Sequence, residues 1–146
     1  SAIDARRVRS LGADAVYVSN HGARQLDSVP PAIRLLPLIR DAVGPDFPLL
    51  FDSGIRNGED VVKALALGAD FVMIGRPALF ALGAEGSRGL TALLQSFASD
   101  IRVVMAQLGV TSIDQLGPDV LFDNTARASD TPDTRTQAAM RLAAKP

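Results

Sequence analysis

Residues 48–76 read PLLFDSGIRNGEDVVKALALGADFVMIGR and contain two short apolar runs with a helical stretch between them. The runs at 48–51 and 71–74 are rich in large apolar side chains and bounded by Gly, Asp or Asn, a pattern that predicts two buried strands. Residues 59–67 favour a helix, and Gly68 suits the left-handed position that ends it. The stretch therefore predicts two strands of a parallel sheet joined by a helix.

The same pattern continues toward the N-terminus. Residues 15–18 predict another strand, and we expect helices at 4–11 and 32–42. The phrase LGAD occurs at 11–14 and again at 67–70, so the joint between helix and strand is repeated. The strands are continuously apolar, which predicts burial on both faces of the sheet.

The segments after the last strand are different in character. Residues 90–108 place large apolar side chains at helical spacing, which predicts a long amphipathic helix on the outside of the sheet. Residues 123–146 are rich in Thr, Asp, Arg and Ala, and we expect a flexible tail there. Three strand–helix units do not close a barrel and would leave unpaired edges, and the chain does not begin with Met. We therefore expect the missing strands to lie upstream.

The composition excludes several classes of function. The chain is 47% apolar with a formal net charge of −1, so it has material for a core and no electrostatic reason to bind nucleic acid or an anionic membrane. It has no cysteine, which rules out a disulfide framework or a Cys-based metal or nucleophile site and agrees with a cytosolic setting. No apolar run approaches the roughly 20 residues of a membrane span. These features fit best a protein that acts on a small molecule.

The phrase after the first strand, SNHGARQLD at 19–27, contains the only histidine of the chain. His21 is followed three residues later by Arg24, and loops that follow the strands of a parallel βα barrel build its active site. An imidazole can accept a proton near neutral pH, and a guanidinium can hold a carboxylate through two hydrogen bonds. The pair suits an anionic acid that loses a proton, although a structural histidine and a solvated arginine remain the alternative.

The phrases after the other two strands are DSGIRNG at 52–58 and GRP at 75–77. Gly54 and Gly75 leave backbone N–H groups open to a ligand, Arg56 and Arg76 supply charge, and the following helices would present their N-termini. Together they predict a phosphate cradle. The alternative is that the glycines are plain turns and the arginines form surface ion pairs.

These three phrases, in this order, resemble the family of FMN-dependent α-hydroxy-acid dehydrogenases and oxidases over residues 3–122. The resemblance implies an α/β fold, with residues 1–122 forming strands six to eight and the C-terminal helices of a TIM (β/α)8 barrel. It implies that His21 is the base and that Arg24 binds the substrate carboxylate. It also implies FMN as the cofactor, bound by Asp52, Ser53, Gly54, Arg56, Gly75 and Arg76, and no metal site.

The sequence departs from the family at two positions of these phrases. Ala23 and Ser53 each stand where many members have glycine. The family's flavin-contacting lysine, its two active-site tyrosines and the acid that supports the histidine belong to earlier strands, which this sequence does not contain.

The resemblance implies oxidation of an L-2-hydroxy acid of the lactate, glycolate or mandelate class to the 2-oxo acid. It leaves the particular acid open, as well as the choice between oxidase and dehydrogenase. We expect a cytoplasmic homotetramer, membrane-associated only through segments outside this chain, with the upstream half of the enzyme as a partner. Two alternatives remain: another FMN or nucleotide phosphate-binding barrel enzyme, and a non-catalytic half-barrel that needs its upstream half.

Overall fold

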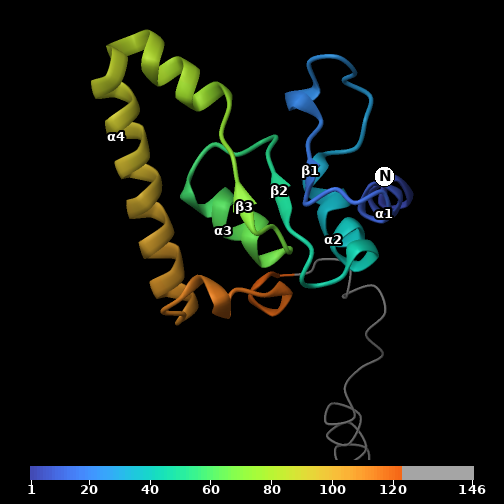
Figure 1. The fold of residues 1–146 in the computed structure, drawn as a ribbon. Helices are drawn as coiled ribbons and strands as arrows, with labels where there is room; N and C mark the ends of the chain where they lie inside the picture. The colour runs from blue at the N-terminus through green and yellow to red at the C-terminus, as the bar shows by residue number, and fades with distance from the viewer. Residues whose placement is uncertain (123–146) are drawn as a thin grey trace, which may run out of the picture.

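The computed structural model describes residues 1–122, which form a three-stranded parallel sheet and its helices (Figure 1). The strands lie in the order β1-β2-β3, and each is followed by a helix, as predicted for βα units. The predicted tail at 123–146 lies outside the described residues. The strands are β1 (Val16–Val18), β2 (Leu49–Phe51) and β3 (Phe71–Val72), and the helices are α1 (Ala2–Ser10), α2 (Ala32–Val43), α3 (Gly58–Ala66) and α4 (Arg76–Leu108), with short 3-10 turns η1 (His21–Ala23), η2 (Ile113–Gln115) and η3 (Pro118–Val120).

Only one face of the sheet is covered by the described helices. Leu49 and Phe51 are fully buried on that face, in a core that α2 and α3 complete. On the opposite face, Tyr17 pairs in register with Leu50, which pairs with Phe71. Tyr17 is 48% exposed and Phe71 is 61% exposed, so the prediction of burial on both faces is wrong for residues 1–122. The sequence carries apolar side chains for a second layer that this part of the chain does not provide.

Helix α4 is longer than the sequence predicted. The expected segment at 90–108 is helical, and Phe97 is its buried anchor. However, the helix begins at Arg76, directly after the last strand, and is interrupted by non-helical backbone at Glu85 and Gly86. Glycine has a low helix propensity, and the first part of α4 contains several glycines. For this reason the sequence pattern did not predict a helix there.

The end of the sheet where the strands begin is held by Arg40. Its guanidinium donates to the carbonyl oxygens of four residues and pairs with Asp70 Oδ2 at 2.5 Å, and Asp70 in turn accepts from Leu49 N. Gly68 has a φ of +101°, and a Cβ there would lie 2.8 Å from Arg40 Cγ. The predicted left-handed joint at Gly68 is thus confirmed, and it leaves room for the arginine. The four carbonyl acceptors are those of Gly44, Pro45, Phe47 and Gly68.

Candidate active site

The three phrases that follow the strands meet around one cavity of about 580 Å³. Its lining residues follow the carboxyl ends of the strands, whereas the partners of Arg40 precede β2 and β3. Figure 1 shows this end of the sheet, where β1 leads into η1 and β3 leads into α4. All of the candidate site residues line it, namely His21, Arg24, Asp52, Ser53, Gly54, Arg56, Gly75 and Arg76. Sequence reasoning missed the apolar part of the wall, which consists of Ile55, Met73, Pro77, Leu79 and Phe80.

His21 lies on a turn with unusual backbone geometry. His21, Gly22 and Ala23 have φ values of +55°, +62° and +62°, so three consecutive residues are left-handed. Residues other than glycine rarely adopt this conformation, and such strain tends to collect at functional sites. The turn is closed by Ala23 N donating to Asn20 O at 3.0 Å, and His21 N donates to Ser19 Oγ at 3.0 Å. The exposed imidazole is therefore carried on a constrained loop.

Asp52 is surrounded by hydroxyl groups. Tyr17 Oη donates to Asp52 Oδ2 at 2.5 Å, and Ser53 Oγ donates to Asp52 Oδ1 at 2.6 Å. Burial raises the pKa of Asp52, but hydrogen bonds from Ser19, Ser53 and Tyr17 and the nearby His21 outweigh it, so the pKa lies below its usual value. Asp52 is thus a carboxylate at neutral pH, with lone pairs left for a further donor.

The cavity is rich in unpaired positive charge. Within residues 1–122, none of Arg24, Arg56 and Arg76 forms an ion pair. The guanidinium of Arg76 reaches from α4 to the histidine turn, where a Cβ on Gly22 would lie only 3.2 Å from Arg76 Nη2. Glycine at position 22 therefore avoids both left-handed strain and a tight contact with this guanidinium. Three free guanidinium groups against one carboxylate make the cavity suited to anions.

The two helix N-termini expected to face a phosphate differ in how far side chains already cap them. At the start of α3, Gly58 N donates to Asp100 Oδ2 and Asp60 N donates to Asn57 Oδ1, so side chains already occupy these groups. Helix α4 begins after Gly75, where no described side chain caps it. At α3, two of these N–H groups are thus already bonded, one of them to Asp100 from a segment 42 residues away.

The glycines of the cradle leave their backbone open. A Cβ added at Gly54 or at Gly75 would meet no atom within 4 Å, so no neighbouring group occupies the space beside either glycine. Gly54 has a φ of +92°, which favours glycine whatever the space around it. Within the described residues, an uncapped helix start, two exposed glycines and three arginines without ion pairs are donors of the kind that bind phosphate groups.

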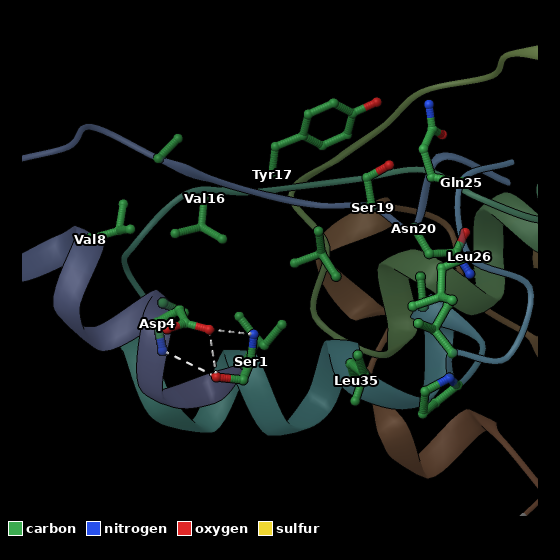
Figure 2. A pocket seen from close by; sticks show the side chains of 17 residues that line it. Ser1, Asp4, Val8, Val16, Tyr17, Ser19, Asn20, Gln25, Leu26 and Leu35 are labelled. Atoms are coloured by element: carbon green, nitrogen blue, oxygen red, sulfur yellow. Dashed lines mark hydrogen bonds and ion pairs between the residues drawn. The ribbon is translucent and has the colours of Figure 1, made fainter. Parts of the chain in front are cut away.

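A second cavity, of about 490 Å³, lies beside β1 (Figure 2). It is walled by side chains from α1, β1 and α2, among them Val8, Val16 and Leu35, and at its edge Asp4 pairs with the N-terminus. No His, Arg or Lys of the described chain lines it, so it is not a second candidate for the same chemistry. It adjoins the edge of β1 that has no neighbouring strand.

Residues 1–122 lack two further features. In that range no three His, Asp or Glu side chains are grouped so that they could hold a metal ion. None of the helices in the same range has the length and apolar character needed to cross a bilayer.

The fold and the cavity together define a class of protein, namely part of a parallel βα-barrel enzyme. Residues 1–123 match the family described as FMN-dependent dehydrogenase, and the chain belongs to that family. This confirms the resemblance identified from the sequence.

Comparison with individual relatives supports the same assignment. The chain is 48% identical over 126 residues to an L-lactate dehydrogenase of Chromohalobacter salexigens, covering 86% of this chain and 32% of that protein. It is 44% identical over 118 residues to an L-lactate oxidase of Alicycliphilus denitrificans, covering 81% and 32%. The chain therefore spans about a third of the length of these relatives.

The structure aligns with part of solved enzymes of the family. It superimposes on a monotopic membrane (S)-mandelate dehydrogenase with a TM-score of 0.81 at 44% identity, over 85% of this chain and 33% of that one. For a mandelate oxidase variant the TM-score is 0.75 at 45% identity, over 78% and 36%. These alignments confirm the predicted fold class: three parallel strands that correspond to part of an FMN-dependent TIM barrel.

Proposed function

We propose that this chain supplies the phosphate-binding and substrate-binding part of an FMN-dependent enzyme that oxidises an L-2-hydroxy acid to the 2-oxo acid. The observation that supports this most is the convergence on a single cavity, at the carboxyl ends of the strands, of one histidine and three arginines that form no ion pair within residues 1–122. Because the chain spans a third of its relatives, the rest of the barrel is the expected partner.

The cofactor end of the cavity is formed by the second and third phrases. Arg56 and Arg76 supply charge for the phosphate of FMN, and the open backbone at Gly54 and Gly75 supplies N–H donors. Asp52, held as a carboxylate, suits the hydroxyl groups of the ribityl chain. When bound, FMN supplies the acceptor for the two electrons that a hydroxy acid gives up.

The substrate end is formed by the η1 turn. The guanidinium of Arg24 would hold the carboxylate of the acid in two hydrogen bonds, which fixes the orientation of the hydroxyl-bearing carbon. The imidazole of His21 would take one proton from the acid, either from the hydroxyl or from the α-carbon.

The names of the relatives support the proposed substrate class. Lactate and mandelate are the acids named in them, and glycolate belongs to the same class. A homotetrameric state and a cytoplasmic location remain predictions of the family resemblance. The exposed side of the sheet, with Tyr17 and Phe71, supports a second possibility in which the chain alone binds phosphate without turnover and becomes active only with its missing half.

The decisive experiment compares the chain alone with a chimera. In the chimera, the chain replaces the matched 126 residues of the Chromohalobacter salexigens L-lactate dehydrogenase. Each protein is loaded with FMN under anaerobic conditions, and lactate, glycolate and mandelate are added in turn. Bleaching of the oxidised-flavin band in the chimera supports the proposal, and bound flavin that no acid bleaches removes the substrate class.

The role of His21 is tested in the same chimera by His21→Ala, with the exposed Ser28→Ala as the control. Loss of a general base costs roughly 10²- to 10⁴-fold in rate. We expect a loss of that order in the rate constant of flavin reduction for His21→Ala, and none for Ser28→Ala. Retention of flavin reduction within about tenfold of the parent would exclude His21 as the base.

A further inference from the structure

Ser53 has a backbone conformation that is unfavourable for serine. Its φ is +82°, in the left-handed region that L side chains rarely adopt, and glycine would occupy the position without strain. A strained conformation of this kind persists only where the surrounding structure determines it, and hydrogen bonds of the side chain are one way to do so.

The hydroxyl of Ser53 makes such interactions with two different loops. Its oxygen accepts from Asn20 N at 3.1 Å and from Gly22 N at 3.4 Å, and it donates to Asp52 Oδ1 at 2.6 Å. The bond from Asn20 has ordinary length, whereas the one from Gly22 is long and therefore weaker. A hydroxyl has one proton to donate and two lone pairs, so these contacts use its full capacity.

The two amides that Ser53 holds lie on either side of His21. Asn20 directly precedes His21, and Gly22 directly follows it in the left-handed turn. Through the same oxygen, Ser53 is joined to Asp52, whose second carboxylate oxygen accepts from Tyr17. One side chain thus ties the turn after β1 to the loop after β2.

We infer that Ser53 is a positioning residue whose hydroxyl fixes the His21 turn relative to Asp52, and that its side chain is not a ligand of the cofactor. The consequence for the reaction rests on the function proposed above. The hydrogen bonds themselves do not depend on it. Ala23, which also has a left-handed φ, has no side-chain polar atom that could act in this way.

Two substitutions in the chimera separate the hydroxyl from the backbone strain. Ser53→Ala removes the hydroxyl and keeps the strain, whereas Ser53→Gly removes both and is expected to fold at least as well as the parent. We expect amide hydrogen–deuterium exchange in a peptide covering residues 19–26 to rise about tenfold in both variants, the factor that corresponds to one lost hydrogen bond of ordinary strength. Exchange in the peptide covering α2 should stay unchanged. Parental exchange at 19–26 in Ser53→Gly would overturn the inference.

Flavin measurements then test the consequence for the reaction. We expect the rate constant of flavin reduction to fall about tenfold in both variants, because the base is no longer held in place. The dissociation constant of FMN should change by less than about threefold. A tenfold weaker binding of FMN with an unchanged reduction rate would instead make the side chain a cofactor ligand and overturn the inference. If the parent binds FMN but no hydroxy acid reduces it, the proposed function fails, while hydrogen exchange still decides the role of Ser53.

Discussion

The hydrogen bond between Tyr17 and Asp52 can be tested directly, because Tyr17 is the only tyrosine of the chain and there is no tryptophan. Burial, the hydrogen bond to Asp52 and the negative charge of Asp52 raise the pKa of Tyr17 from 10.0 to about 12. A phenol with a raised pKa stabilises the fold below its unfolded pKa and loses that contribution as the pH rises through the folded value. The free energy of unfolding should therefore fall between about pH 10 and pH 12.

The assay is a spectrophotometric titration of the phenolate band of the full chain, with circular dichroism recorded at each pH to show that the helices persist. We expect a midpoint near pH 12 for the parent. Asp52→Asn removes the charge and keeps the shape, so its midpoint should move toward pH 10 but not reach it, since burial remains. Tyr17→Phe should abolish the band and so confirms its origin. A midpoint near pH 10 in a parent that is still folded, or an equal midpoint in Asp52→Asn, would refute the contact.

Three further predictions concern other parts of the chain. Arg40→Ala should lower the free energy of unfolding by about 3 kcal/mol in a urea titration, because it leaves part-buried carbonyl groups without a donor, whereas the exposed Arg34→Ala should change it by less than about 0.5 kcal/mol. Ala23→Gly should raise the thermal midpoint, because relief of about 1–2 kcal/mol of left-handed strain exceeds the added entropy of about 0.5–1 kcal/mol in the unfolded chain; an unchanged or lower midpoint would argue against strain at this turn. Arg76→Ala in the chimera should weaken retention of FMN on dialysis more than it slows flavin reduction, and unchanged flavin content would count against a phosphate site.

Much of the fold could be predicted because its signals are local. Short apolar runs and the repeated LGAD phrase marked the strands and joints, and Gly68 has the left-handed φ expected of it. The candidate site could be predicted because the phrases after parallel strands must meet at one end of the sheet, and its residues do line one cavity. What pattern reasoning missed depends on distant contacts. The capping of α3 by Asp100 joins residues 42 apart, and the exposure of Phe71 depends on which layers the chain itself provides.

The two ends of the sheet differ: one carries strained loops, and the other is held by the hydrogen bonds of Arg40. In residues 1–122, the non-glycine residues with a left-handed φ are His21, Ala23 and Ser53, and all three lie in the loops at the cavity end. Strained backbone persists only where the surrounding structure determines it. At the opposite end, Arg40 donates to a carbonyl group between α2 and β2 and to another between α3 and β3. These hydrogen bonds fix the strands that carry the strained loops. Loss of the Arg40 hydrogen bonds should therefore change the geometry of the His21 turn, although Arg40 does not contact that turn. Arg40→Ala should thus also raise hydrogen exchange in the peptide covering residues 19–26.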